Sequence, residues 1–283
     1  MTVRSYFLPR SLPEALDLVG QHGSALLMMA GGTVAMPLIN EGISLPEVVM
    51  GLRHVGLRGL DRHDGVLRIG ATTTLTRLAE QDEIPMLREA ARRTASWAVR
   101  NLATVGGNLF TPPPGGDIAV ALLALDATVT LISSRGERSV PLADFFTGFM
   151  TTGLADDELL TAIEAPIPTG PTAFIKFGRK DANTPAVVTV ATRIVRDGSR
   201  VTEARIALGA AGPHPIRARE AERALVGTTL APADIAAAAA AARDTCDPFT
   251  DAVATDWYRR RMVGVFVART LEQVAPGAAQ EVR

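Results

Sequence analysis

Two glycine-rich stretches, Ala30-Gly31-Gly32-Thr33 and Thr104-Val105-Gly106-Gly107-Asn108, decide how the rest of this 283-residue sequence is interpreted. Each contains two adjacent glycines, so its backbone carries no Cβ there and another group can approach the N–H donors closely. A row of such donors in a turn suits an anion, above all a pyrophosphate. We expect Thr33 to cap a short helix that runs through Ile39 to Gly42, which adds a helix N-terminus to the same site. Two such loops facing each other would clamp a dinucleotide.

The glycine pairs are not specific by themselves, because a single Gly-Gly pair is also typical of a plain turn. Neither stretch has the spaced glycines that open a dinucleotide-binding βαβ unit, and no Gly-Lys-Ser/Thr follows, so the P-loop pattern is absent. The dinucleotide interpretation therefore depends on the sequence around the two loops.

The flanking motifs supply a family resemblance. The apolar run before AGGT, the segment VRNLATVGGN, Asp117 and the segment LLALDA resemble the FAD-binding medium subunit of molybdenum hydroxylases, the relatives of xanthine dehydrogenase and carbon monoxide dehydrogenase. Further similar motifs are Gly136-Glu137-Arg138, Asp144-Phe145-Phe146-Thr147-Gly148, Asp157-Glu158-Leu159-Leu160, Lys176 with Arg179, Arg205-Ile206-Ala207-Leu208-Gly209, Pro215-Ile216-Arg217-Ala218 and Tyr258-Arg259. The resemblance covers almost the whole chain in order.

The expected architecture is α+β with two domains. The segment PIPTGP at 166–171 is the best linker candidate, because its prolines and glycine oppose regular structure. The resemblance implies an FAD-binding domain of the vanillyl-alcohol-oxidase/p-cresol-methylhydroxylase type at 1–168, with subdomains of about 1–54 and 55–168. After the linker, 172–283 would form a C-terminal domain with three strands at 172–180, 186–196 and 200–209, followed by helices ending near 227 and over 231–242 and 255–274.

Local patterns predict the elements of the first domain. We expect a helix over 12–19, strands at 25–29, 46–52, 66–70 and 158–166, helices over 74–80, 85–95 and 117–124, and a hairpin over 127–140. The segment 97–116, which contains the second glycine loop, is expected to be irregular.

By the same resemblance, fourteen residues would contact the cofactor, which would be bound noncovalently. They are Met29, Ala30, Gly31, Gly32, Thr33, Val34, Thr104, Gly106, Gly107, Asn108, Thr111, Asp117, Leu160 and Lys176. Bonds from N–H groups to phosphate stabilise by about 1.5–3 kcal/mol each, so four or five across the two loops would hold the cofactor without a cationic clamp.

Individual residues keep a second interpretation. Asp117 would contact a ribitol or ribose hydroxyl, although it is equally well placed to be a helix N-cap only. Lys176 would lie near N1 and C2=O of the flavin and stabilise its reduced form, or it is a solvated strand lysine. Thr184 stands where some relatives place an aromatic residue over the flavin, and Pro112-Pro113-Pro114 replaces a more usual polar turn. The run Arg259-Arg260-Arg261 either docks a partner or forms an exposed helix face, the commoner case.

Composition excludes several other classes. The formal charge of -1 and the pI near 6.4 give no reason to expect nucleic acid or an anionic membrane as a partner. The N-terminal sequence has no apolar core of signal-peptide length, and the longest apolar stretch, Ile118 to Ile132, is broken by Asp126 and is too short to span a bilayer. We therefore expect a soluble cytoplasmic protein. The single cysteine, Cys246, cannot ligate an iron–sulfur cluster alone. His22, His54, His63 and His214 lack metal-ligand spacing, and no metal site is expected.

The resemblance implies the FAD subunit of a three-subunit molybdenum hydroxylase. A large subunit would carry molybdopterin and a small subunit two [2Fe-2S] centres, in a dimer of heterotrimers. This chain would pass electrons from the clusters to NAD⁺, a quinone or O₂, with no catalytic acid or base of its own. The alternatives are a self-contained flavin oxidoreductase with the same fold and a non-catalytic nucleotide-binding subunit.

Overall fold

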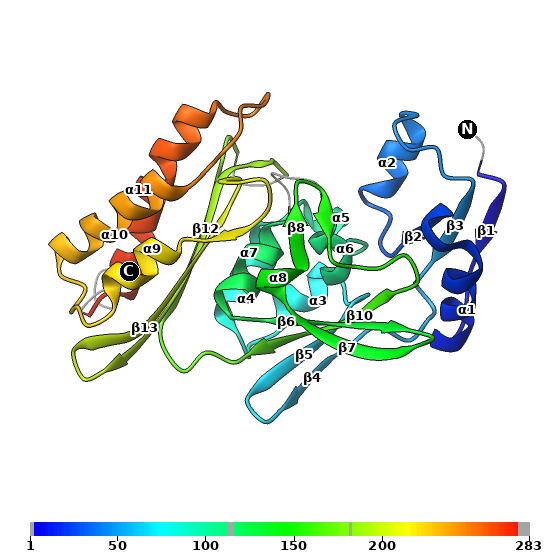
Figure 1. The fold of residues 1–283 in the computed structure, drawn as a ribbon, viewed down its shortest axis with the longest axis horizontal. Helices are drawn as coiled ribbons and strands as arrows, with labels where there is room; N and C mark the ends of the chain where they lie inside the picture. The colour runs from blue at the N-terminus through cyan, green and yellow to red at the C-terminus, as the bar shows by residue number, and fades with distance from the viewer. Residues whose placement is uncertain (1–2, 112–115, 181–182, 277–283) are drawn as a thin grey trace.

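The structure is a computed structural model that describes residues 3–111, 116–180 and 183–276. The proline run expected at 112–114 lies outside these residues. Within the described ranges, the strands form sheets of three, five and four strands and a short two-stranded ribbon. The three larger sheets follow one another along the molecule, with the N-terminal sheet at one end and the C-terminal sheet at the other (Figure 1). The expected α+β class is confirmed.

The N-terminal unit is a small parallel sheet with order β1-β3-β2. Its elements are β1 (Ser5–Phe7), α1 (Leu12–His22), the 3-10 turn η1 (Gly23–Ala25), β2 (Leu26–Met29), α2 (Ala35–Asn40) and β3 (Val48–Gly51). The sequence did not predict β1, because three residues are too few to show a period. The expectation that Thr33 caps α2 is wrong. The N-cap is Val34, which makes no side-chain cap bond, and the Met36 N–H closes the first turn onto the Gly32 carbonyl oxygen at 2.9 Å.

The central unit is a five-stranded antiparallel sheet with order β4-β5-β10-β6-β7, one face of which is covered by helices (Figure 1). Its strands are β4 (Leu60–His63), β5 (Val66–Gly70), β6 (Thr128–Ser133), β7 (Gly136–Pro141) and β10 (Leu159–Pro166). Its helices are α3 (Leu75–Glu80), α4 (Pro85–Arg93), α5 (Trp97–Arg100), α6 (Val105–Leu109), α7 (Asp117–Ala124) and α8 (Leu142–Phe145), and the ribbon strands are β8 (Phe146–Gly148) and β9 (Thr151–Thr152).

The segment 97–116, expected to be irregular, contains the two short helices α5 and α6. Side-chain caps explain both of them. The Ser96 hydroxyl accepts the Val99 N–H at 3.4 Å, and the Thr104 hydroxyl accepts the Gly107 N–H at 3.1 Å. A Ser or Thr cap satisfies an otherwise unpaired first-turn amide, so a helix of one turn forms without a long apolar pattern.

The C-terminal unit is a four-stranded sheet with order β11-β12-β13-β14, covered on one face by three helices (Figure 1). Its elements are β11 (Thr172–Gly178), β12 (Ala186–Asp197), β13 (Arg200–Gly209), β14 (Ile216–Arg217), α9 (Arg219–Leu225), α10 (Pro232–Thr245) and α11 (Asp256–Val274). The three expected long strands are present, and the two-residue β14 adds a fourth. The other face packs on α7, every residue of which is buried.

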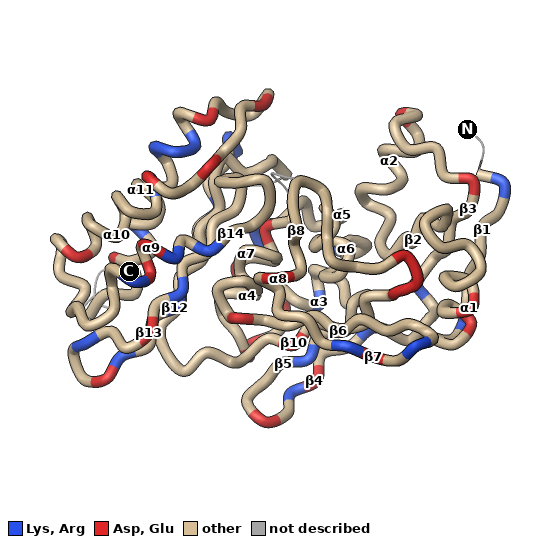
Figure 2. Tube along the Cα trace, viewed as in Figure 1, with Lys and Arg blue, Asp and Glu red and all other residues tan. Residues whose placement is uncertain are grey.

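One carboxylate joins the central unit to the C-terminal sheet. Asp126 follows α7 with a φ of 55°, and its oxygens accept bonds from Arg193, Arg205 and Arg217 at 2.8, 2.7 and 2.6 Å. The three arginines come from β12, β13 and β14, where basic positions gather along the sheet (Figure 2). This cluster fixes the helical layer of one unit against the sheet of the next.

The run of three arginines in α11 is not one exposed face, so that expectation is wrong for Arg259. Its residue surface is 0% exposed, and it pairs with Asp251 at 2.7 Å, whereas Arg261 is exposed. A buried guanidinium needs a partner charge and hydrogen bonds to offset its desolvation, and both are present. None of the helices in the described ranges combines the length and apolarity that a membrane crossing requires.

Candidate functional site

A cavity of about 860 Å³ lies where the three units meet, and it brings together every site residue predicted from the sequence. Its lining includes Met29, Ala30, Gly31, Gly32, Thr33, Val34, Thr104, Gly106, Gly107, Asn108, Thr111, Asp117, Leu160 and Lys176. The two glycine loops face each other, since a Cβ built on Gly107 would lie 4.0 Å from the Ala30 Cβ. The volume is within the range of about 300–1,000 Å³ that small-molecule and cofactor sites occupy.

The first glycine loop offers free hydrogen-bond donors. In the described part of the chain, the backbone N–H groups of Gly31, Gly32, Thr33 and Val34 have no hydrogen-bond acceptor. Gly32 has a φ of 71°, a conformation that favours glycine. Successive unpaired N–H groups around a turn form an anion-binding concavity. This loop therefore fits a phosphate group.

Gly31 has a second role, which is to let the loops approach each other. A Cβ built on it would lie 2.1 Å from the Leu102 carbonyl oxygen, and this contact is with backbone that cannot rotate away. Only glycine allows the first loop to rest on the segment that leads into the second loop.

The second glycine loop differs from the expectation, because its amides are already used within the protein. The N–H groups of Val105, Gly106, Gly107 and Asn108 donate to Thr73 O, Ala71 O, Thr104 Oγ1 and Thr104 O at 2.9, 2.9, 3.1 and 3.0 Å. The expected row of four or five free donors shared by both loops is therefore wrong. The second loop contributes shape: a Cβ built on Gly106 would lie 2.8 Å from the Ala71 carbonyl oxygen.

Asp117 is not the N-cap of α7, and Lys176 is not a solvated lysine. Gly116 is the N-cap, and the Asn108 side chain accepts the Ile118 N–H at 3.1 Å. Asp117 instead accepts from Lys176 Nζ at 2.6 Å and from the Thr189 hydroxyl at 2.7 Å.

The Asp117 and Lys176 side chains are only 6% and 8% exposed. This buried ion pair joins α7 to β11, and therefore the central unit to the C-terminal sheet.

The cavity lining is apolar and close to neutral. Among its described residues, Asp117 and Lys176 are the only ionisable side chains, and they neutralise each other. No group of three or more His, Cys, Asp or Glu residues in the described ranges is arranged to hold a metal ion. The arrangement suits binding of a large, partly apolar anion.

Sequence analysis missed several lining residues. Ala95, Met150 and Asn183 have φ values of 55°, 57° and 49°, which are uncommon for residues other than glycine. Such conformations often gather at functional sites, but they are visible only in the structure. Thr184, singled out from the sequence, lines the cavity together with Pro185 and Ala186.

Comparison with known proteins identifies the class. The family described as "FAD binding domain in molybdopterin dehydrogenase" matches residues 2–168, and "CO dehydrogenase flavoprotein C-terminal domain" matches residues 172–274. The chain therefore belongs to the family of FAD-binding medium subunits of molybdenum hydroxylases. It is an oxidoreductase subunit with FAD as its cofactor.

Individual relatives are similar to this chain over nearly their full lengths. The alpha subunit of the 6-hydroxypseudooxynicotine dehydrogenase complex of Paenarthrobacter nicotinovorans is 32% identical over 94% of this chain and 92% of its own. The carbon monoxide dehydrogenase medium chain of Afipia carboxidovorans is 32% identical over 95% of each chain. A solved structure of carbon monoxide dehydrogenase from Hydrogenophaga pseudoflava superposes with a TM-score of 0.91 at 32% identity, covering 95% of this chain and 96% of that one.

Proposed function

We propose that this chain is the electron-transfer flavoprotein subunit of a molybdopterin-dependent hydroxylase or dehydrogenase. In this role it takes electrons from [2Fe-2S] centres of a partner subunit and delivers them to an external acceptor. The observation that carries the proposal is the cavity between the facing glycine loops. It is lined by four N–H groups that have no acceptor among the described residues and by the Asp117–Lys176 pair. Bound FAD supplies the conversion between one-electron and two-electron transfer.

The residues of the cavity divide into binding and electrostatic roles. The N–H groups of residues 31–34 hold the pyrophosphate, at about 1.5–3 kcal/mol for each hydrogen bond to a charged group. Asp117 keeps lone pairs beyond the two that Lys176 and Thr189 use, so it can also accept from a ribitol or ribose hydroxyl. Lys176 keeps two of its three N–H donors for the flavin N1 and C2=O region. Leu160, which is 4% exposed, packs against the ring.

The other residues predicted to contact the cofactor form the walls of the cavity. Met29, Ala30 and Thr111 line the cavity beside the loops, and Thr104, Gly106, Gly107 and Asn108 form its floor on the second loop. The described lining contains no His, Cys or Tyr side chain, the groups to which flavins attach covalently, and this supports noncovalent binding.

The partners follow from the class. The relatives are named as a subunit of a dehydrogenase complex and as a medium chain, and the structure from Hydrogenophaga pseudoflava is described as lacking the Mo-pyranopterin moiety of the molybdenum cofactor. We propose a large molybdopterin subunit and a small [2Fe-2S] subunit, assembled as a dimer of heterotrimers in the cytoplasm. The molar mass of the native complex and cell fractionation test these two points.

The domain boundary stays a proposal. The two family matches end and begin at residues 168 and 172, which supports division into 1–168 and 172–283. Expression of these two fragments separately tests it, because each domain should give its own cooperative unfolding transition.

The cofactor is tested on the purified chain. We expect one FAD per chain, released into the supernatant by acid precipitation. A yellow pellet with a colourless supernatant would contradict noncovalent binding, and a chain that purifies colourless and takes up no FAD would favour the non-catalytic nucleotide-binding alternative.

The electron-transfer role is tested by partner dependence. The isolated chain should be reducible by dithionite, yet in its oxidised form it should not oxidise xanthine, aldehydes, CO or N-heterocycles with multiple turnovers. Addition of the molybdenum and iron–sulfur subunits should allow substrate to bleach the flavin absorbance. Multiple turnovers by the isolated chain would establish the alternative, a self-contained flavin oxidoreductase.

A further inference from the structure

One wall of the FAD cavity is formed by the described end of the connection between β11 and β12. We call Asn183, Thr184, Pro185 and Ala186 the wall segment; all four line the cavity. The β11–β12 pairing is irregular here, because Phe177 pairs with Val188 whereas Gly178 pairs with Ala186. Such a bulge leaves backbone groups outside the ladder and redirects the chain. The wall segment therefore needs support from elsewhere.

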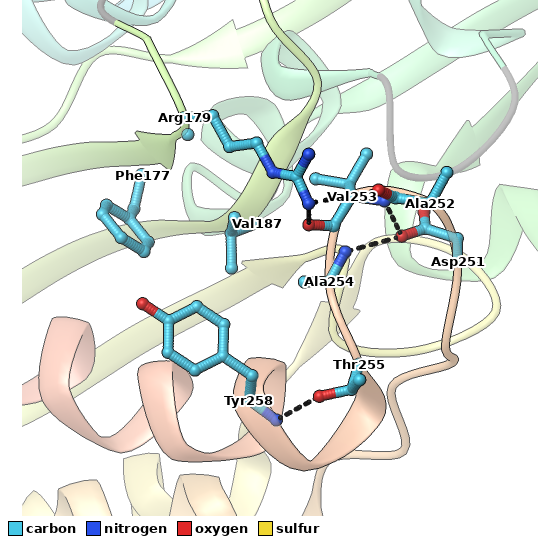
Figure 3. Close-up of a pocket in the computed structure, with 10 residues that line it drawn as sticks. Phe177, Arg179, Val187, Asp251, Ala252, Val253, Ala254, Thr255 and Tyr258 are labelled. Carbon is cyan, nitrogen blue, oxygen red and sulfur yellow. Dashed lines mark hydrogen bonds between the residues drawn. The ribbon is translucent and has the colours of Figure 1, made fainter.

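Two arginines supply that support by anchoring both ends of the connection to the loop 251–254. At the end that follows β11, Arg179 donates through Nη2 to the Ala252 and Val253 carbonyl oxygens at 3.2 and 2.6 Å. Figure 3 shows its guanidinium reaching across to Val253. At the end that leads into β12, Arg259 donates through Nη1 to the carbonyl oxygens of Ala186 and Val187 at 3.1 and 2.8 Å. The bulge carbonyls are thereby satisfied.

The loop that receives these bonds is itself held by Asp251. Its Oδ1 accepts from Arg259 Nη2 at 2.7 Å and from the N–H groups of Val253 and Ala254 at 2.8 and 3.0 Å. Burial alone would favour the neutral acid, but the Ala254 N–H, the Arg259 guanidinium and the Val253 N–H together hold the pKa of Asp251 below its ordinary value. Asp251 therefore stays ionised and keeps the loop and Arg259 in one arrangement.

Burying the Arg259 guanidinium costs desolvation free energy, so packing alone does not explain why an arginine stands here. Arg259 is 0% exposed, and its Nε is buried without a hydrogen-bond partner among the described residues. A buried ion pair often stabilises no more than an apolar replacement of similar volume would. The geometry gives it a different use, because its hydrogen bonds end on residues 186 and 187, directly beside the cavity.

We propose that Arg259 and Arg179, acting through the loop 251–254, are positioning residues that fix the wall segment and so control how closely acceptors approach the bound flavin. The inference rests on the proposed function and adds to it the residues that set acceptor access. Neither arginine lines the FAD cavity, so each acts through the wall segment.

The test compares conservative variants with matched neighbours. Arg179→Gln removes the anchor from an exposed position, and Arg259→Lys keeps the charge but loses the forked geometry. Lys180→Gln and Arg261→Gln are the controls: both residues are exposed, and neither makes a described bond to the wall segment or to the loop. For each protein, the melting temperature, the FAD dissociation constant and the rate of reoxidation of dithionite-reduced flavin by ferricyanide at saturating FAD are measured.

We expect both anchor variants to bind FAD up to about tenfold more weakly (roughly the free energy of one hydrogen bond), because a displaced wall segment packs less closely on the cofactor. We also expect both to be reoxidised faster than the wild type. Both controls should match the wild type. Thr184→Tyr should slow reoxidation in the wild-type background and lose most of that effect in the Arg179→Gln background, because coupled residues are not additive. A purely structural contact would lower the melting temperature without changing reoxidation or this coupling.

The outcomes separate the two proposals. A wild-type chain that binds no FAD would refute the proposed function and this inference with it. A wild type that binds FAD, with Arg179→Gln unchanged in melting temperature, affinity, reoxidation and coupling to Thr184→Tyr, would overturn the inference alone. If Arg259→Lys does not fold, Arg179→Gln decides the matter, since its side chain is on the surface.

Discussion

Lys176→Met should destabilise the protein strongly, because it leaves the Asp117 carboxylate buried without its cation. The two charged atoms are 2.6 Å apart and both side chains are less than a tenth exposed. Breaking such a pair from one side costs about 3–5 kcal/mol, whereas an exposed pair contributes about 0–1 kcal/mol. We therefore expect Lys176→Met to reduce the free energy of unfolding by about 3–5 kcal/mol.

The measurement is a double-mutant cycle on the FAD-free chain, by urea unfolding followed with far-UV circular dichroism. Asp117→Asn keeps an acceptor for Thr189 but leaves the Lys176 ammonium unpaired. The double variant Lys176→Met/Asp117→Asn removes both charges, so it should be more stable than the sum of the single effects by at least about 2 kcal/mol. Arg77→Gln, which breaks an exposed pair with Glu80 at 3.9 Å, is the control and should cost no more than about 0.5 kcal/mol. A loss below about 1 kcal/mol for Lys176→Met, or additivity in the cycle, would refute the reasoning.

Three further predictions concern other parts of the chain. Gly31→Ala should weaken FAD at least tenfold (roughly one charged hydrogen bond), measured by fluorescence titration, whereas Gly20→Ala, which meets nothing within 4 Å, should not; equal affinities would contradict the close-approach role. The hydrogen bond from Arg138, together with that from the Ala155 N–H, lowers the pKa of Glu158 against the effect of burial. The ionised Glu158 therefore contributes its full stabilisation above its ordinary pKa of 4.5, and this stabilisation is lost as pH falls through the lowered value. Glu158→Gln should make the free energy of unfolding less dependent on pH in this acid range. An unchanged pH dependence would contradict a stabilising Arg138–Glu158 pair. Burial raises the pKa of the Cys246 thiol, which is 3% exposed, so iodoacetamide should label it only after unfolding, and rapid native labelling would disprove this.

Most of the residues that line the cavity and were predicted from the sequence belong to short motifs. The residues of both glycine loops are local in sequence, so their turn chemistry could be recognised before any contact was known. What could not be predicted depends on partners distant in the chain. The Gly106 amide is used by the Ala71 carbonyl oxygen, which no local pattern reveals. Asn108 takes over the capping of α7, and this leaves Asp117 to pair with Lys176.

The fold shows the same division between local and distant causes. Long strands and helices with clear periods were predicted close to their observed bounds, as with β12 and α11. The predictions were wrong or incomplete where a contact with a distant part of the chain determines the burial of a residue or the presence of a strand. Arg259 reads as one of three surface arginines in the sequence, yet its position under the bulge of β12 buries it completely. The three-residue strand β1 is too short to show a period in the sequence, and it is recognised only by its pairing with β3.

The cavity is completed by segments from distant parts of the chain, with residues 29–35 on one side and Lys176 and residues 183–186 on another. This has a consequence for biosynthesis. A nascent chain displays the first glycine loop long before the ribosome has made the opposite wall, so FAD has no complete pocket until the C-terminal sheet has folded. Because a ligand that binds only the native state stabilises it by mass action, cofactor loading should act as a checkpoint that marks full-length, folded chains. Truncated chains would instead present an open apolar cavity to the proteases and chaperones that recognise such surfaces.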